Sequence, residues 1–297
     1  MKKRFLNKWI FVGIIFLFIG INIVQSSSIP LSKLPIISSK NTLYVGGIGT
    51  NNFSKIQNAI ENASDGFTVF VYDDSSPYYE NLEISKSIIL LGENKNSTII
   101  DGSGKKEVIF LSANNIVIKD FSIMNSSANS SGILIYKYAN YVEISKNIIK
   151  DNCRGIFLYN PGYHMIYPFG KNLGPNENYI ENNFILNNTM GISLYGSNNN
   201  KIRRNWIENN NYGISISRGD YPTAPPSYGN RITKNVFIGN NKSAFDECNN
   251  RWISNYWDDW IGLKYKIFRF LPYRIPGSFR FLSNLDWFPA KNPIEIV

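Results

Sequence analysis

Two repeated sequence patterns constrain the fold of this chain more than any other feature. Four segments begin with Gly-Ile and then alternate, and they start at Gly132, Gly155, Gly191 and Gly213. Each is followed by a second pattern with Asn at its corner, as in Asn200-Lys-Ile-Arg-Arg-Asn205. Uninterrupted copies lie 22 or 23 residues apart. A fixed period near 22 residues is typical of a solenoid, in which each repeat forms one coil.

The alternation within these segments indicates short β-strands. Nowhere in this stretch do apolar residues recur at helical spacing for long enough to form helices. Two or three strands per repeat, joined by Asn and Gly corners, predict one coil of a parallel β-helix, with coils stacked at about 4.8 Å. We therefore predict an all-β chain, a parallel β-helix of about seven coils. The alternative, an antiparallel sandwich, would show no fixed period.

Asparagine is unusually frequent, with 41 residues concentrated in the middle of the chain. Its side chain bonds nearby backbone groups and so favours turns. In stacked coils, Asn side chains at one corner can hydrogen-bond along the axis as a ladder, while the Ile and Leu side chains of the Gly-Ile strands point inward and form columns. Phe121 takes the corner position one coil earlier. The spacing places five residues in this ladder: Asn147, Asn183, Asn205, Asn235 and Asn255.

The chain divides into three parts. We expect the β-helix and its N-terminal cap over residues 42–256, because residues 53–63 have apolar residues at helical spacing, which suits a helix over the first coil. Residues 257–297 lose the repeat and become rich in aromatic residues and proline, so we expect a C-terminal cap and tail.

Residues 1–28 have the pattern of an export signal. A basic stretch is followed by an apolar run at residues 9–24 and then by small polar residues. This order is typical of a secretory signal peptide. The apolar run is shorter than the roughly 20 residues of a usual membrane span, but tilting or thinning of the bilayer would let it act as a signal anchor. Cleavage and membrane anchoring both stay open, and either one places the rest of the chain outside the cytoplasm.

Composition excludes several classes of protein. One His and two Cys cannot form a zinc-finger type centre or a dense disulfide framework. The net charge is +9, but four of the positive charges lie in the first eight residues. The remaining excess is modest, so we expect no nucleic-acid partner.

Several segments together resemble a known class of proteins. They are Tyr44-Val45, Ile56 to Ile60, Tyr79 to Ile84, Leu91 to Asn94 and Ile99 to Gly102. They resemble the opening of right-handed parallel β-helix proteins of the pectate-lyase-like class. With the Asn corners and the ending Asn255 to Trp260, the chain looks most like archaeal exported proteins grouped with the NosD-type periplasmic copper-binding family. The resemblance covers about residues 42–290 and implies a right-handed coil.

The clearest candidate for a binding site is a row of tyrosines. Alternation sends Tyr136, Tyr159 and Tyr195 outward at the same position of three coils, and rows of exposed aromatic rings suit stacking on sugars. Two long insertions follow this row, at residues 160–177 and 218–228, and loops on a regular scaffold often carry function. Their candidate ligand-binding residues are Tyr163, Tyr167, Arg218, Asp220 and Tyr221. The alternative is that the loops cover the tyrosines and extend the core.

Three functions stay open for a chain with these features. The favoured one is a non-catalytic binding module for surface glycans or for a cell-surface partner protein. The second is a polysaccharide-modifying lyase, hydrolase or epimerase, which needs carboxylates converging at about 5 to 9.5 Å. No two acids fall at the same position of adjacent coils, so catalysis is not favoured; the acids considered are Asp101, Asp120, Asp151, Asp246, Asp258 and Asp259. Of these, we expect Asp101 in a turn, Asp258 and Asp259 in the cap, and Asp151 paired with Arg154.

The third function is metal handling. The resemblance implies copper, because founding members of the NosD family are implicated in copper delivery to nitrous oxide reductase. Copper prefers His, Met and Cys ligands, and His164-Met165 offers two of these in one insertion. Cys153 and Cys248 lie about three coils apart, so we predict separate thiols.

Overall fold

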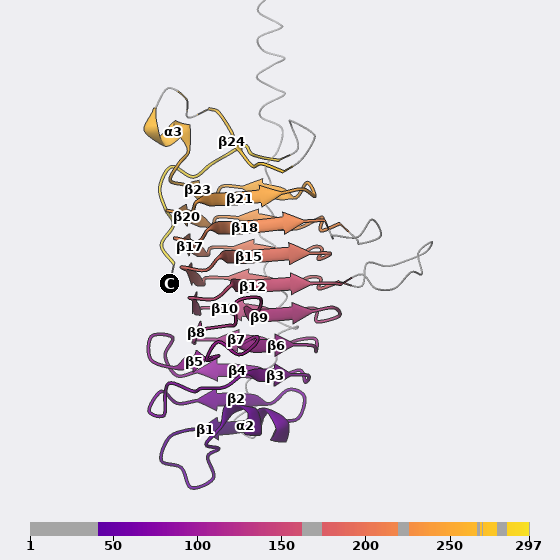
Figure 1. The fold of residues 1–297 in the computed structure, drawn as a ribbon, viewed down its shortest axis with the longest axis vertical. Coiled ribbons are helices and arrows are strands. Elements are labelled where there is room, and N and C mark those ends of the chain that lie inside the picture. The colour runs from indigo at the N-terminus through magenta and orange to yellow at the C-terminus, as the bar shows by residue number, and fades with distance from the viewer. Residues whose placement is uncertain are drawn as a thin grey trace, which may run out of the picture. The chain divides into compact units, whose positions relative to one another are not determined.

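The computed structural model shows a stack of β-coils (Figure 1). It describes residues 41–161, 174–218, 226–265, 268, 270–277 and 284–296. All of these belong to one compact unit, residues 36–297. The export-signal prediction for residues 1–28 lies outside the described residues. Within the described ranges, no helix is both long and apolar enough to cross a membrane.

Three parallel sheets run along the stack, and each coil contributes one strand to each sheet. Sheet 1 contains the Gly-Ile strands: β3 (Leu82–Ile84), β6 (Ile109–Leu111), β9 (Ser131–Tyr136), β12 (Arg154–Tyr159), β15 (Met190–Tyr195), β18 (Tyr212–Ser217) and β21 (Lys242–Asp246). Sheet 2 contains β1 (Thr42–Val45), β2 (Thr68–Val71), β4 (Ile89–Gly92), β7 (Val117–Lys119), β10 (Glu143–Ser145), β13 (Tyr179–Glu181), β16 (Lys201–Arg203), β19 (Arg231–Thr233) and β22 (Arg251–Ile253). Sheet 3 contains β5 (Ile99–Asp101), β8 (Ser122–Met124), β11 (Ile148–Lys150), β14 (Phe184–Leu186), β17 (Trp206–Glu208), β20 (Val236–Ile238) and β23 (Tyr256–Trp257).

The chain passes through sheets 1, 2 and 3 in turn, so β3 to β23 make seven complete coils. The predicted right-handed parallel β-helix of about seven coils is confirmed. Sheet 2 is two strands longer than the others, because β1 and β2 precede the first complete coil.

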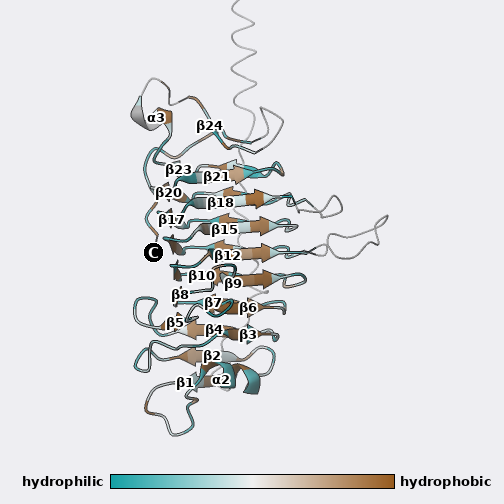
Figure 2. Ribbon diagram, viewed as in Figure 1, coloured by the Kyte–Doolittle hydropathy of each residue, from teal (hydrophilic) through white to brown (hydrophobic). Residues whose placement is uncertain are grey.

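Columns of aliphatic side chains fill the interior, as predicted. In sheet 1, Ile156 pairs in register with Ile133 and Ile192, and all three are fully buried. Figure 2 shows the strands as the hydrophobic parts of each coil. Burying one such side chain contributes about 1.5–3 kcal/mol to the stability of the folded state. Branched apolar side chains are typical of parallel strands that are buried in this way. Sheets 2 and 3 carry matching isoleucine columns: Ile118, Ile144, Ile180, Ile202 and Ile232, and Ile123, Ile149, Ile185 and Ile207.

The predicted asparagine ladder runs through the corner between sheets 2 and 3. From Asn183 onward, each Asn accepts two bonds at its Oδ1, one from the backbone N–H and one from the side-chain amide of the preceding Asn. At Asn205, these come from Asn183 N at 3.1 Å and Asn183 Nδ2 at 3.0 Å. The same pattern links all five predicted residues, and Phe121 N donates to Asn147 Oδ1 at the start.

Two further ladders, which the sequence analysis did not predict, occupy the other corners. They consist of Asn152, Asn188, Asn210 and Asn240, and of Asn178, Asn200, Asn230 and Asn250. The turn residue before each corner often has a positive φ, for example 53° at Arg204 and 55° at Asn209. Asn tolerates this left-handed conformation better than most residues, and this tolerance helps explain why the coils contain so much of it.

Both predicted caps are present. At the first coil, α2 (Ile56–Asn62) buries Ile56, Ala59 and Ile60. Its first two N–H groups have no partner inside the helix, and Ile56 N and Gln57 N donate instead to the carboxylate of Glu80, at 2.8 and 3.0 Å. The tertiary contact therefore fixes the start of the cap helix.

The C-terminal cap covers the last coil with aromatic rings. The Trp257 ring is stacked between Phe237 and Tyr273, with centroid distances of 4.2 and 4.0 Å. Tyr273 lies on β24 (Tyr273–Arg274), which pairs antiparallel with β25 (Leu285–Asp286). The short helix α3 (Ile261–Lys264) lies between β23 and this pair in the chain. Stacked rings close the open end of the interior, where unpaired strand edges would otherwise meet water.

Candidate ligand-binding surface

The predicted tyrosine row forms a column on sheet 1. Tyr159 pairs in register with Tyr136 on one side and with Tyr195 on the other, because each is the last residue of its strand. The ring centroid of Tyr159 lies 6.1 Å from that of Tyr136 and 5.3 Å from that of Tyr195. All three side chains are half-buried. The coil period therefore brings together three residues that are far apart in the sequence.

The column is longer than the sequence analysis predicted. The ring centroids of Phe110 and Tyr136 are 5.5 Å apart. The Phe157 ring stacks on the Tyr159 ring with a centroid distance of 4.9 Å and an interplanar angle of 28°. Phe157 could have been found from sequence, because a residue two positions before Tyr159 shares its face of the strand. We call the five residues the aromatic column; they are Phe110, Tyr136, Phe157, Tyr159 and Tyr195.

Cations lie over two rings of the column. Lys137 Nζ is 5.2 Å from the centre of the Tyr136 ring, and the Arg154 guanidinium is 4.9 Å from the centre of Phe157. Neighbouring tyrosine rings are tilted by 42° and 55°. The surface is therefore a ridge of ring faces and edges with cationic groups beside it. Such a surface offers apolar contact together with hydrogen-bond donors, a combination that suits sugar rings.

Arg218 is the predicted loop residue that belongs to the described part of the chain. Arg218 follows β18 directly, is exposed, and donates its backbone N–H to Glu247 Oε2 at 3.1 Å. Ser217, the preceding residue, pairs in register with Tyr195. Arg218 therefore lies on the coil that follows the last tyrosine of the column. The other predicted loop residues lie outside the described residues: Tyr163, His164, Met165, Tyr167, Asp220 and Tyr221.

Two of the described acids, Asp101 and Asp259, have structural partners. Asp101, as expected of a turn residue, accepts bonds from Ser103 N at 2.7 Å and Asn125 Nδ2 at 2.8 Å. In the C-terminal cap, Asp259 Oδ2 accepts a bond from the Tyr273 hydroxyl at 3.0 Å. Burial is the main cause that raises the pKa of Asp259 above its ordinary value.

The expected pair of Asp151 and Arg154 is wrong. Asp151 lies in a turn with a φ of 57° and contacts Lys150 at 3.9 Å. Arg154 belongs to β12, where its guanidinium lies over Phe157 and donates to the carbonyl of Asn129 at 3.1 Å. The left-handed turn directs the two side chains to different neighbours.

The candidate copper ligands His164 and Met165 lie outside the described residues. In the part of the chain that the structure describes, no three His, Cys, Asp or Glu side chains are grouped so that they could hold a metal ion. The Met190 sulfur accepts a hydrogen bond from Ser193 Oγ at 3.3 Å.

The two cysteines are free thiols, as predicted; Cys153 is half-buried and Cys248 is buried. Burial raises the pKa of Cys248 to about 11 from the ordinary 9.0.

Only the thiolate reacts with alkylating agents, and a shift of this size reduces the thiolate fraction of Cys248 at pH 8 about a hundredfold. In a Cys153→Ser variant, we expect iodoacetamide to label Cys248 about a hundredfold more slowly in the native protein than in urea, as measured by mass spectrometry. Equal rates would contradict this prediction.

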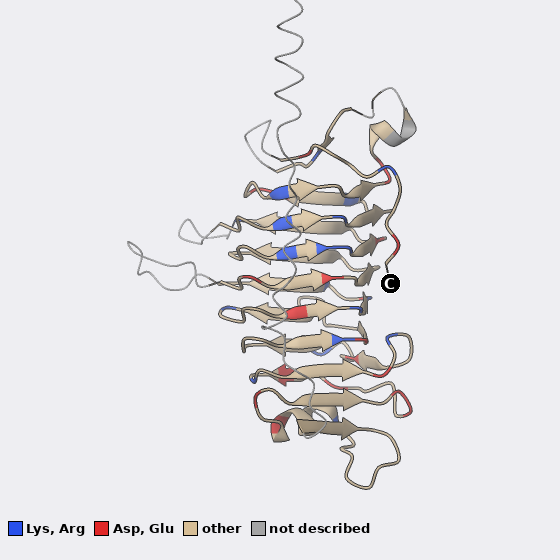
Figure 3. Cartoon of the chain, turned by 180° about the vertical axis from the view of Figure 1, so that it is seen from behind, with Lys and Arg blue, Asp and Glu red and all other residues tan. Residues whose placement is uncertain are grey.

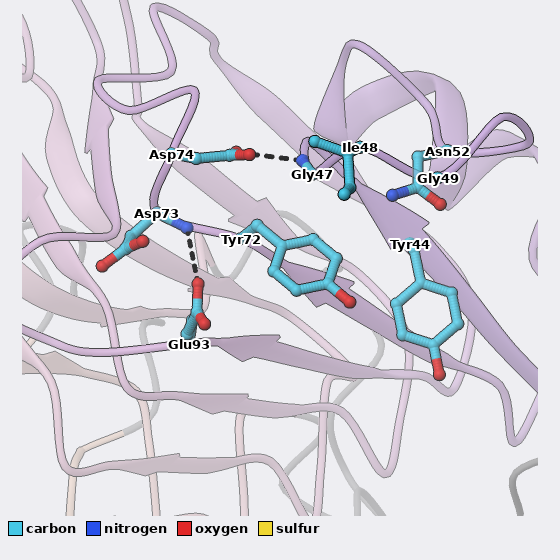
Figure 4. A pocket seen from close by; sticks show the side chains of 9 residues that line it. All are labelled: Tyr44, Gly47, Ile48, Gly49, Asn52, Tyr72, Asp73, Asp74 and Glu93. Carbon is cyan, nitrogen blue, oxygen red and sulfur yellow. Dashed lines mark hydrogen bonds between the residues drawn. The ribbon is translucent and has the colours of Figure 1, made fainter.

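A separate hollow of about 550 Å³ lies at the C-terminal coils of sheet 2, where Arg231 and Arg251 meet Trp287 and Phe288. Another, of about 580 Å³, lies near the first strands (Figure 4). There, Asp74 accepts the N–H of Gly47 at 2.9 Å, and Glu93 accepts the N–H of Asp73 at 3.0 Å. These bonds give the acids of the second hollow a role in holding its loops.

Comparisons with known proteins agree with the resemblance. The family model of the periplasmic copper-binding protein NosD matches residues 173–267. No curated protein matches the chain. Similar solved structures include a pectin methylesterase from carrot, at 14% identity and a TM-score of 0.48, covering 82% of this chain and 86% of that one. For a pectin methylesterase from Yersinia enterocolitica, the identity is 13% and the TM-score 0.38, and the match covers 80% of this chain and 89% of that chain. For pectate lyase Pel9A, the identity is 15% and the TM-score 0.41, and the match covers 74% of this chain and 70% of that chain.

Proposed function

We propose that this chain, a right-handed parallel β-helix of the NosD-like type, is a non-catalytic binding protein that holds a surface glycan along its aromatic column. The alignment of Tyr136, Tyr159 and Tyr195 on three successive coils is the observation that carries the proposal. We further propose that the protein works outside the cytoplasm. The signal pattern of residues 1–28 and the periplasmic family description support that location.

The geometry of the column suits an extended chain of sugars. The centroids of successive tyrosine rings on neighbouring coils are 5.3 to 6.1 Å apart, so a glycan lying along the coil axis contacts a new ring at each coil. The rings are half-buried and packed against one another, so little side-chain freedom is lost when a ligand binds. Lys137 and Arg154 lie beside the rings and supply hydrogen-bond donors for sugar hydroxyl groups.

A binding role is also supported by how the described carboxylates are used. Asp246 and Asp286 are fully buried and accept hydrogen bonds from the chain itself, while Asp101 holds a turn. Hydrolysis of a glycosidic bond requires two carboxylates that face one substrate. These three acids are instead engaged in structure. Copper binding rests on the family description alone.

The test is glycan-array binding by the full chain with Tyr136, Tyr159 and Tyr195 all replaced by alanine. Each ring contributes about 0.5–1.5 kcal/mol beyond its area burial, so we expect affinity for the bound glycan to fall at least about tenfold. A Tyr159→Phe variant keeps the ring and should bind within about twofold of the wild type. Tyr138→Ala removes a tyrosine that is 48% exposed and outside the column, and serves as the control.

The outcomes separate the two kinds of partner. If the triple variant binds every glycan as well as the wild type does, the aromatic column is not the glycan site. If the wild type binds no glycan, and the triple variant loses a protein partner captured by the wild type, the column serves a protein.

A further inference from the structure

We infer that sheet 2 carries a second binding site, for an acidic polysaccharide chain, at the C-terminal coils. This site lies on a different sheet from the aromatic column and uses none of its residues. It therefore stands independently of the proposed function. The inference rests on a row of cations in register, on two arginines whose guanidinium groups have no partner among the described residues, and on an exposed tryptophan beside them.

The cations line up on neighbouring strands. Lys201, Arg231 and Arg251 are the first residues of β16, β19 and β22, and they pair in register. Adjacent strands are about 4.8 Å apart, and like charges directly opposite each other destabilise a sheet. Figure 3 shows Lys and Arg on neighbouring strands toward the C-terminal coils and acidic residues on strands nearer α2. The repulsion within this row would be relieved by an anionic ligand.

Acidic residues balance little of this charge. The outward positions of β13, β16, β19 and β22, together with the turn residue after each strand, contain six cations and one acid. They are Lys201, Arg203, Arg204, Arg231, Lys234 and Arg251, with Glu181 as the acid. Glu181 is already paired with Arg203, and Lys201 Nζ lies 4.7 Å from the centre of the Tyr179 ring.

Arg231 and Arg251 are exposed, and among the described residues their guanidinium groups form no hydrogen bond or ion pair. Both line the hollow of about 550 Å³ at the edge of the C-terminal cap. A guanidinium group can bind a carboxylate through two parallel hydrogen bonds, which gives strength and orientation together. Two such groups on adjacent coils can hold two acidic groups of one chain.

The cap supplies an aromatic wall for the same hollow. Trp287 and Phe288 line it and are 53% and 68% exposed. Exposed rings of this size beside cations are typical of a binding surface. Asp286, the residue before Trp287, is fully buried and accepts hydrogen bonds from Asn255 and Trp257, which anchors the backbone beside the hollow. The indole ring is therefore presented on a fixed segment.

The combination favours an acidic glycan over other anions. A glycan with one carboxylate per sugar offers charges in a line and apolar ring faces between them, which match the cation row and the tryptophan. Two buried carboxylates, Asp246 and Asp286, lie behind the surface, but their oxygens already accept hydrogen bonds from the last coil and its cap. They do not occupy the arginines.

The experiment measures binding of the full chain to polygalacturonate, with a neutral dextran and a single-stranded oligonucleotide as comparison ligands. The variant is Arg231→Gln with Arg251→Gln. It removes like-charge repulsion, so it should fold at least as well as the wild type. The loss of one hydrogen bond to a charged group weakens binding by about tenfold. We expect the double variant to bind polygalacturonate at least about tenfold more weakly.

The matched control is Lys105→Gln with Lys106→Gln, which removes the same charge from two exposed residues in an early coil. It should bind within about twofold of the wild type, whereas Trp287→Ala should weaken polygalacturonate binding with no change of charge. Equal losses in the control and the arginine variant would overturn the inference, because only net charge would matter. Equal binding of the oligonucleotide and polygalacturonate, or a loss confined to the aromatic-column variant, would overturn it as well.

Discussion

Replacing Asn205 by alanine should lower the free energy of unfolding by about 4 kcal/mol. Its side chain accepts two bonds from Asn183 and donates to the carbonyl of Ile180 at 2.9 Å and to Asn235 Oδ1 at 3.0 Å. Asn205 is fully buried, so water cannot replace these partners. Alanine leaves two donors of Asn183 without a partner and removes one of the bonds to the Ile180 carbonyl, and each buried unsatisfied group costs about 1–3 kcal/mol.

Urea unfolding followed by circular dichroism measures this change. The control is Asn211→Ala in the same coil, because Asn211 is exposed and its side chain accepts one exposed bond from Asn241 at 2.9 Å. The control should change stability by less than about 0.5 kcal/mol. Similar stabilities of the two variants would show that the ladder does not hold the coils together.

The sequence predicted the coil and the aromatic column because both follow from one period. Once copies 22 or 23 residues apart are stacked, Tyr136 must lie next to Tyr159, and the structure confirms this through the strand register. The insertion between β12 and β13 did not hide the relation, since the Gly-Ile pattern resumes in the next coil. The register between successive repeats can therefore be predicted from the sequence.

The cation row and its hollow were not predicted, although the register of Arg231 and Arg251 follows from the same period. The missing information is which charges are paired. Glu181 neutralises Arg203 one coil away, and no sequence pattern shows that Arg231 has no ion-pair partner in the part of the chain that the structure describes. Trp287 belongs to the cap, where the period ends. Its position depends on a hydrogen-bond network that is visible only in three dimensions.

The direction of the ladders also could not be predicted, and it explains two buried acids. In the ladder that ends at Asn255 and in the one that ends at Asn250, each amide donates one N–H to the next residue toward the C-terminal end, as Asn183 does to Asn205 and Asn235 does to Asn255. The last Asn of each of these two ladders therefore faces a position that must only accept. A carboxylate meets this need because both of its oxygens accept. Asp286 ends the first ladder, and Asp246 ends the ladder that contains Asn250.

The second prediction therefore concerns Asp286→Asn, which keeps the size of the side chain and changes only its hydrogen bonding. Oδ1 accepts from Ser254 N at 3.0 Å and Phe288 N at 3.2 Å. Oδ2 accepts from Asn255 N, Asn255 Nδ2 and Trp257 Nε1, at 2.9, 3.0 and 3.2 Å. Whichever way an amide is turned, its NH₂ group faces donors. We expect a loss of about 3 kcal/mol in the free energy of unfolding, measured in urea.

The same chemical change at an exposed acid separates this effect from the loss of a charge. Asp151→Asn removes a carboxylate whose contact with Lys150 is 3.9 Å long and largely open to solvent, so stability should change by less than about 1 kcal/mol. Asp286→Asn should also weaken the quenching of Trp257 fluorescence by its stacked neighbours, because the indole loses its acceptor and the cap loosens. A stable Asp286→Asn protein with unchanged fluorescence would mean that the ladder does not require an acceptor at its end.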